Sequence, residues 1–110
     1  MTPDAYIVRK KYYTDKNGDL WSCNKVIKKL FDIGINREVF YILSYYGDDK
    51  TNDEFYGELH LKRREWTFMK NEYMIDKNLH MVMENNKKIF QEIDEYFYWN
   101  PDKILILDCK

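Results

Sequence analysis

The chain has 110 residues, 18 Lys and Arg against 19 Asp and Glu, and a formal net charge of −1. This length suits one small core, so we expect residues 1–110 to form a single globular domain. No apolar run approaches the roughly 20 residues that span a bilayer, and the N-terminus lacks a secretory signal, which excludes an integral membrane protein and favours a cytoplasmic one. Cys23 and Cys109 are too few for a disulfide scaffold and are expected to be reduced thiols.

The first predicted elements form a hairpin. Residues 5–13 are rich in β-branched and aromatic side chains and predict a strand. Asn17-Gly18 then predicts a tight turn, because both residues tolerate a positive φ, and Leu20 and Trp21 begin the returning strand.

Periodicity governs the next two segments. Apolar residues at helical spacing predict a helix that begins near Ser22 or Asn24 and ends at Gly34; they are Val26, Ile27, Leu30, Phe31 and Ile33. Residues 37–46 are mostly β-branched or aromatic, which favours a strand. The same segment also has a helical face between a possible cap at Asn36 and a stop at Gly47, so a helix stays open as the alternative.

The second half of the chain predicts further short elements. Residues 47–54 are expected to form an exposed polar loop, and Leu59 and Leu61 alternate with polar residues as in a half-buried strand. A change of apolar parity places a bulge or turn within 62–65, and a weak hairpin is expected over 73–75 and 79–83. Residues 86–98 predict an amphipathic helix that Asn100-Pro101 stops, and 104–107 predict an interior strand.

These elements predict an α+β fold. We expect a mixed, mainly antiparallel sheet of about six short strands, with two helices packed against it. The last strand, helix and strand (79–83, 86–98 and 103–108) could be joined by a right-handed parallel crossover.

The sequence contains little that indicates catalysis. It has no glycine-rich phosphate loop, no HExxH and no paired CxxC motif. His60 and His80 each lie between two apolar residues on predicted strands, which favours surface or structural roles, and Cys23 near a helix start lacks a neighbouring base. Residues 15–19 begin like a calcium loop, but the required Gly and Glu are replaced by Leu20 and Val26. We therefore expect no enzyme activity, metal or cofactor.

One alternative is binding to DNA. Residues 26–43 resemble a helix-turn-helix with its turn at Gly34-Ile35-Asn36. Two downstream segments, Gly57-Glu58-Leu59 and Arg63-Arg64-Glu65-Trp66, resemble the wing of excisionase-type proteins. This resemblance implies a winged helix-turn-helix regulator built on residues 24–70. The side chains that would contact DNA are Asn36, Arg37, Tyr41, Lys62, Arg63 and Arg64.

The favoured hypothesis is a non-enzymatic binding protein. Codon-biased composition, with many Lys, Asn, Ile and Tyr and a single Ala, indicates an AT-rich genome such as that of a phage or mobile element. Carboxylates beside tyrosines suit a partner with a basic surface, such as a nuclease that an immunity-type inhibitor would block. The expected contact residues are Tyr45, Tyr46, Asp48, Asp49, Asp53, Glu54, Tyr56, Glu92 and Glu95.

Overall fold

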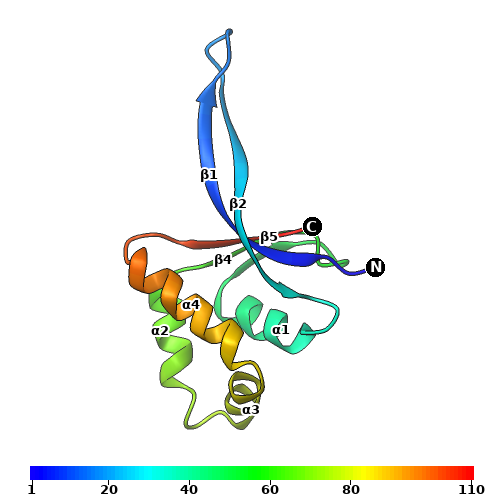
Figure 1. The fold of residues 1–110 in the computed structure, drawn as a ribbon, viewed down its shortest axis with the longest axis vertical. Helices are drawn as coiled ribbons and strands as arrows, with labels where there is room; N and C mark the ends of the chain where they lie inside the picture. Colours follow the sequence, from blue (N-terminus) through cyan, green and yellow to red (C-terminus); the bar gives the residue numbers. More distant parts are fainter.

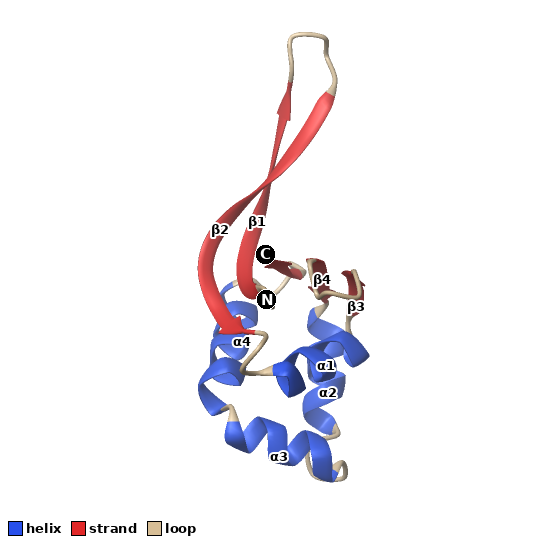
Figure 2. Cartoon of the chain, turned by 90° about the vertical axis from the view of Figure 1, so that its right-hand side faces the viewer, coloured by secondary structure: helices blue, strands red, loops and turns tan.

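A five-stranded antiparallel sheet with the order β2-β1-β5-β4-β3 organises the chain, and four helices lie on one side of it, with α3 farthest from the strands (Figures 1 and 2). The computed structural model describes residues 1–110. In chain order the elements are β1 (Asp4–Thr14), β2 (Leu20–Asp32), α1 (Arg37–Tyr46), β3 (Asp48–Thr51), β4 (Gly57–Leu61), α2 (Arg63–Asn71), α3 (Lys77–Asn85), α4 (Lys87–Trp99) and β5 (Leu105–Cys109). The predicted α+β class is confirmed, with five strands rather than six and four helices rather than two.

The hydrophobic core lies between the sheet and the helices. Alternate residues of the strands point toward the helices and are buried, as in Ala5 and Ile7 of β1 and Leu105 and Leu107 of β5. The helices supply large side chains to the same cluster of 21 residues, including Trp66 of α2 and Phe97 of α4. The other face of the sheet has no helix on it (Figure 2). It carries polar residues such as Glu58 and His60 together with the apolar pair Val8 and Ile106.

The hairpin of β1 and β2 extends well beyond the sheet. β1 pairs with β5 only over Ala5–Val8, whereas it pairs with β2 as far as Thr14. Residues 9–25, hereafter the arm, therefore project as a two-stranded ribbon away from the helices, and the molecule reaches 53 Å in its longest dimension (Figures 1 and 2). The predicted Asn-Gly turn is confirmed at its tip, where Gly18 has a φ of 83°.

The predicted helix that ends at Gly34 is wrong, because this segment is the second half of β2. The register of β1 and β2 shifts between Ala5 and Tyr6 and again between Ile7 and Val8, which leaves Leu30 and Ile27 without a partner on β1. Each bulge adds one residue to β2 and so reverses the face to which later side chains point. Two bulges three residues apart thus imitate the apolar spacing of a helix.

Residues 37–46 form helix α1, so the favoured strand is wrong and the helical alternative is confirmed. Val39, Phe40, Ile42 and Leu43 are buried on one side of it, and burial of that stripe outweighs the β propensity of the side chains. Part of the predicted loop 47–54 is the short edge strand β3, which pairs with β4.

The predictions for residues 57–83 are confirmed in part. The strand at Leu59 and Leu61 is confirmed as β4, and the parity change after it marks the start of α2. The weak hairpin over 73–83 is wrong: Asp76 accepts a hydrogen bond from the Leu79 backbone N–H (3.0 Å) and caps helix α3. No parallel crossover exists, since every strand pair is antiparallel. No helix has the length and apolar character needed to cross a membrane.

Candidate nucleic-acid interface

The arm is the most basic part of the chain. It carries five cations and two carboxylates in a protein whose net charge is −1; the cations are Arg9, Lys10, Lys11, Lys16 and Lys25. Strand pairing gathers cations that are distant in sequence, since Arg9 lies opposite Lys25. Four of them are exposed and have no carboxylate within 4.0 Å, whereas Lys10 is half-buried and pairs with Glu58.

Each face of the arm combines cations with aromatic or polar groups. Residues directly opposite in an antiparallel pair share a face. One face carries Arg9, Lys11 and Tyr13 beside Lys25, Cys23 and Trp21, and the other carries Lys10, Tyr12 and Thr14 beside Asn24, Ser22 and Leu20. Tyr12, Tyr13 and Trp21 are all at least half exposed. The arm therefore presents rigid aromatic rings next to positive charge on both faces.

Asp15 organises the tip of the arm. Its carboxylate accepts hydrogen bonds from the backbone N–H groups of Asn17 (2.9 Å) and Asp19 (3.0 Å), and from the indole Nε1 of Trp21 (2.7 Å). The hydrogen bond from Trp21 lowers the pKa of Asp15, assisted by the turn amides. One of the two carboxylates of the arm is thus occupied in building the turn and in holding a tryptophan ring.

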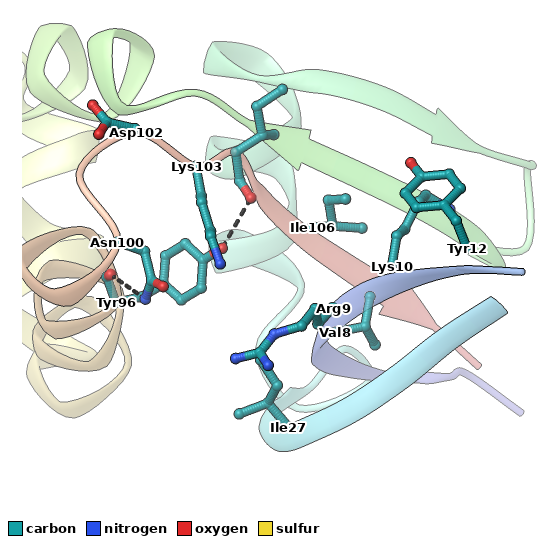
Figure 3. Close-up of a pocket in the computed structure, with 11 residues that line it drawn as sticks. Val8, Arg9, Lys10, Tyr12, Ile27, Tyr96, Asn100, Asp102, Lys103 and Ile106 are labelled. Atoms are coloured by element: carbon teal, nitrogen blue, oxygen red, sulfur yellow. Dashed lines mark hydrogen bonds between the residues drawn. The ribbon is translucent and has the colours of Figure 1, made fainter. Parts of the chain in front are cut away.

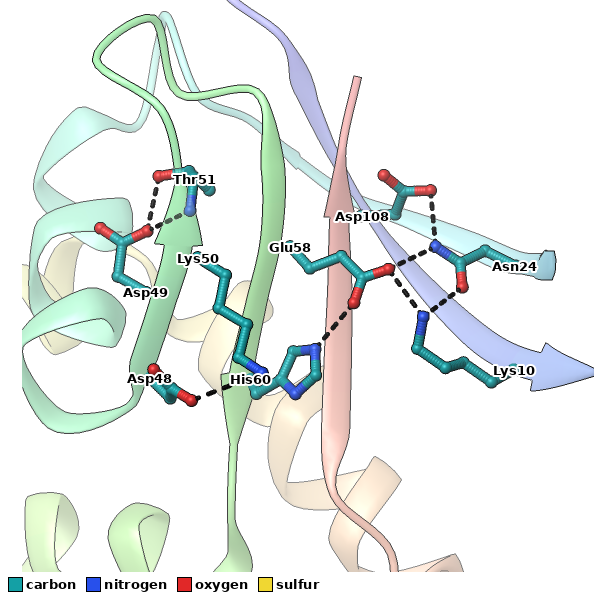
Figure 4. Close-up of polar contacts among 9 residues, drawn as sticks. All are labelled: Lys10, Asn24, Asp48, Asp49, Lys50, Thr51, Glu58, His60 and Asp108. Atoms are coloured by element: carbon teal, nitrogen blue, oxygen red, sulfur yellow. Dashed lines mark hydrogen bonds and ion pairs between the residues drawn. The ribbon is translucent and has the colours of Figure 1, made fainter. Parts of the chain in front are cut away.

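A polar cluster on the open face of the sheet fixes the base of the arm (Figure 4). Glu58 of β4 accepts hydrogen bonds from Lys10 Nζ (2.8 Å), Asn24 Nδ2 (2.9 Å) and His60 Nε2 (2.8 Å). Asn24 also donates to Asp108 (3.1 Å) and accepts from Lys10 (3.1 Å). These contacts connect both strands of the arm to β5 and β4.

The charge of Glu58 is held firmly by this cluster. Burial raises the pKa of the carboxyl, but hydrogen bonds from Asn24, Lys10 and His60 outweigh that effect and lower it from 4.5 to about 2. Glu58 is therefore an anion at neutral pH and anchors Lys10, so that the arm leaves the sheet at a defined angle.

A second group of cations lies beside the base of the arm. Lys62, Arg63 and Arg64 stand at the start of α2, and Lys103 lies between α4 and β5; we call these four residues the basic tract. Lys103 lines a cleft shared with Arg9 and Lys10, and also a depression shared with Arg63 and Arg64 (Figure 3). The base of the arm thus adjoins the basic tract, and the arm and the tract together are called the basic surface.

Most cations without a carboxylate partner belong to this surface. Seven of the 18 Lys and Arg side chains lie within 4.0 Å of a carboxylate oxygen. Of the other eleven, eight lie on the arm or in the basic tract: Arg9, Lys11, Lys16, Lys25, Lys62, Arg63, Arg64 and Lys103. Local charge on this surface is therefore not neutralised within the chain.

The predicted helix-turn-helix is not formed, because a strand and not a helix precedes Gly34. Asn36 is at the N-cap position of α1, but its side chain donates to the Asp32 carbonyl (3.3 Å) and makes no capping hydrogen bond. Arg37 is exposed at the start of α1 and lies 5.8 Å from the centre of the Phe55 ring. Tyr41 is exposed on α1. The other three residues predicted to contact DNA, Lys62, Arg63 and Arg64, do not lie on a wing but at the start of α2, in the basic tract.

The predicted acidic and tyrosine-rich residues lie in two separate places. Glu92 and Glu95 are on α4, and Glu92 forms an ion pair with Lys28 of β2 (3.4 Å). Asp48 and Asp49 are on β3, the edge strand at the side of the sheet opposite β2, and Asp53 and Glu54 are in the turn that follows β3. The two groups therefore do not form one surface.

The residues around β3 differ in exposure. Tyr45 is 80% exposed, whereas Tyr46 packs against the core and lies 6.1 Å from the ring of Phe68. Tyr56 is half-buried, and its hydroxyl donates to the Met1 carbonyl (3.4 Å). Asp49 accepts hydrogen bonds from the Thr51 backbone N–H (2.9 Å) and hydroxyl (2.5 Å). The part of this set that faces solvent consists of Tyr45, Asp48, Asp49, Asp53 and Glu54.

The candidate nucleophiles and bases are dispersed. Cys23 is exposed on the arm, and burial raises the pKa of the Cys109 thiol to about 12. His60 lies in the Glu58 cluster as expected for an open-face residue, but His80 is on helix α3, where its ring stacks 4.3 Å from that of Tyr73. No group of three or more His, Cys, Asp and Glu side chains is arranged to hold a metal ion.

The arm was not among the binding surfaces predicted from the sequence. Its cations are spread over 17 residues, and a basic composition has a codon-bias explanation when it is counted along the chain. The signal becomes clear only when the strand register pairs Arg9 with Lys25 and when the fold brings Lys103 beside them. The chain matches no protein-family model, no curated protein and no solved structure.

Proposed function

We propose that this chain is a non-enzymatic nucleic-acid-binding protein that contacts the sugar-phosphate backbone with the arm and the basic tract. One observation carries this proposal. The arm and the basic tract together carry nine cations, of which only Lys10 lies within 4.0 Å of a carboxylate, although the whole chain has a net charge of −1. Carboxylates on or beside these segments are largely occupied: Glu58 pairs with Lys10, Asp15 is engaged by the turn, and Glu65 accepts a hydrogen bond from the Lys62 backbone N–H (2.8 Å). Asp19 and Asp102 make no ion pair.

The division of charge favours an anionic polymer. Cations that neutralise phosphates release condensed counterions, and this release supplies most of the affinity in non-specific binding. The rest of the chain carries an excess of carboxylates, so phosphates are repelled there and attracted by the arm. A neutral protein can thus bind nucleic acid in one orientation.

The shape and the side chains of the arm support the same function. Two-stranded ribbons enter nucleic-acid grooves, and aromatic rings next to Arg or Lys provide stacking contacts. Tyr13 and Trp21 lie directly opposite each other near the tip, and Asp15 holds the indole of Trp21. The arm therefore offers these rings in a fixed arrangement.

Fluorescence anisotropy with labelled oligonucleotides tests this function. Double charge reversal in the basic tract (Arg63→Glu with Arg64→Glu) should weaken binding at least tenfold, because two favourable phosphate contacts become repulsive. The matched control is Lys77→Glu with Lys88→Glu, which makes the same change of net charge at the end of the molecule opposite the arm (Figure 1). Equal losses in both variants would contradict a localised interface.

Salt dependence provides a second, quantitative readout. If about five cations contact phosphates, the slope of log K against log salt should be about −3.5 for a single strand or −4.5 for a duplex. Lys11→Gln should make that slope less steep by about 0.7 for a single strand or about 0.9 for a duplex, the amount that corresponds to one lost phosphate contact. A slope near zero in the wild-type protein would reject the proposal.

We also propose a second candidate, a protein partner with a basic surface that docks at the β3 edge. The supporting observation is the exposed ring of Tyr45 beside Asp48 and the acidic turn at Asp53 and Glu54. An inhibitor of a nucleic-acid enzyme would use such an edge. The test is affinity capture of binding proteins by immobilised wild-type protein and by the immobilised double variant Asp48→Lys with Asp49→Lys. A basic protein captured equally by both would contradict this candidate.

A further inference from the structure

A cleft of about 600 Å³ lies where the arm separates from the rest of the sheet (Figure 3). One wall is the base of β1 with Lys10 and Tyr12, and the other is the segment between α4 and β5 with Lys103. Val8 and Ile106 are neighbours across β1 and β5 and supply apolar surface to it. The cleft thus combines cations, aromatic rings and an apolar patch.

The backbone of β1 is available along this cleft. β1 pairs with β5 only as far as Val8, so beyond that residue the edge of β1 that faces β5 has no strand partner. Unpaired N–H and C=O groups on a strand edge offer hydrogen bonds to any flat polar group that enters. They suit the donor and acceptor edges of a nucleobase.

The rings at the cleft differ in freedom. Tyr96 is fixed, since its hydroxyl donates to the Ile104 carbonyl (3.0 Å), and burial raises the pKa of this phenol. Tyr12 is 65% exposed and carries no hydrogen bond that would hold its ring. A base that enters the cleft can stack on Tyr12, and such stacking tolerates any base.

Positive charge continues from the cleft in one direction. Arg9, Lys103 and one carboxylate, Asp102, line it, and neither of these two cations has a carboxylate oxygen within 4.0 Å. The depression that shares Lys103 leads to Arg63 and Arg64. A phosphate chain that leaves the cleft would therefore meet cations at successive positions.

We infer that this cleft binds one unstacked nucleotide of a single strand, whose backbone then follows the basic tract. This inference rests on the proposed nucleic-acid binding and names its form. Bases inside a duplex are stacked and cannot enter a cleft, whereas single strands present them. An acidic peptide would satisfy the cations but would leave the stacking surface of Tyr12 unused.

The test compares Tyr12 with an exposed tyrosine outside the arm and the cleft, Tyr98 of α4, which is 74% exposed. The probes are labelled single-stranded dT12, a 12-base-pair duplex and an abasic 12-residue phosphodeoxyribose strand. Wild-type protein should bind dT12 at least tenfold more tightly than the abasic strand. Tyr12→Ala should weaken dT12 binding about tenfold and leave duplex binding within twofold. Tyr98→Ala should leave the affinities for dT12 and for the duplex both within twofold of wild type.

The outcomes separate the two proposals. Failure to bind any probe would reject both. Salt-sensitive binding of all three probes with equal affinity, or equal effects of Tyr12→Ala and Tyr98→Ala, would keep nucleic-acid binding and reject the cleft. Displacement of dT12 by a 12-residue polyglutamate as efficiently as by unlabelled dT12 would also reject the cleft and indicate a protein ligand. Circular dichroism of both variants should match wild type, since both rings are at least half exposed.

Discussion

The arm and the helix-covered part of the sheet differ in what holds them together. The first residues of β1 are buried, with Ile7 and Val8 each 2% exposed, whereas Tyr12 and Tyr13 further along the same strand are mostly in solvent. The covered part is stabilised by a core of 21 residues. The arm has only its strand ladder, the Asp15 turn and the Glu58 cluster.

This difference separates stability from the proposed binding. A two-stranded hairpin is at best marginally stable on its own, so the arm depends on its anchorage. Because its side chains contribute no area to the core, they can change without unfolding the protein. Substitutions in the core, the anchor, the tip and the acidic edge should therefore produce a graded series of effects.

The largest effect is expected in the core. Trp66 is 2% exposed and stacks between Phe90 (5.8 Å) and Phe97 (6.3 Å). Trp66→Ala should lower the free energy of unfolding by about 3–5 kcal/mol in urea titrations. Phe68→Ala, on the exposed side of the same helix, should cost about 1 kcal/mol or less. Similar losses of unfolding free energy in the two variants would contradict the placement of Trp66 in the core and of Phe68 on the surface.

The anchor should give the next largest effect, and it depends on pH. The pKa of Glu58 is about 2 in the folded protein and near 4.5 without its partners, so the stabilisation is complete above about pH 4.5 and is lost as pH falls toward 2. Between pH 5 and 2.5, wild type should lose about 1–3 kcal/mol more than Glu58→Gln, a range that allows for solvent screening. Glu54→Gln, in the exposed turn, should follow wild type.

The elements that could be predicted from sequence are those with one clear local signal. The Asn17-Gly18 turn, the alternating residues of β4 and the amphipathic face of α4 each identify their element without knowledge of its neighbours. Their structure depends on local geometry and on one buried face.

The misassigned elements depend on contacts distant in sequence. Bulges at Ile27 and Leu30 exist only because β2 must stay paired with β1, and they produce apolar spacing like that of a helix. Residues 37–46 have strand propensity but bury one helical face under the sheet. The candidate interface was hidden for a related reason: Arg9, Lys103 and Arg63 meet only after the antiparallel sheet has formed.

The tip should respond locally. Asp15→Ala removes three hydrogen-bond acceptor contacts from the turn and from Trp21, so hydrogen exchange of backbone amides near the tip should accelerate about tenfold. The free energy of global unfolding should change by less than about 1 kcal/mol, because the tip can fray while the core stays folded. Asp19→Ala is the matched control, since the Asp19 side chain makes no hydrogen bond. Faster exchange in the core strands of Asp15→Ala would show that the arm and the core unfold together.

The smallest effect on stability and on nucleic-acid binding is expected at the acidic edge. Asp48→Lys with Asp49→Lys should alter the free energy of unfolding by about 0.5–1 kcal/mol, chiefly through the hydrogen bonds that Thr51 donates to Asp49. β3 lies at the edge of the sheet opposite β2, roughly 19 Å away across four strand spacings, which exceeds the Debye length of about 8 Å at physiological salt.

Affinity for dT12 should therefore rise less than threefold in that variant. Glu92→Lys with Glu95→Lys makes the same change of charge beside Lys28 and Ile27, near the base of the arm, and should raise the affinity more. Anisotropy titrations of both variants at 0.15 M and 0.5 M salt measure this difference, which should shrink at the higher concentration because exposed charges are screened. A larger gain from the β3 variant would mean that phosphates pass along the acidic edge rather than along the arm, and the proposed orientation of the nucleic acid would have to be reversed.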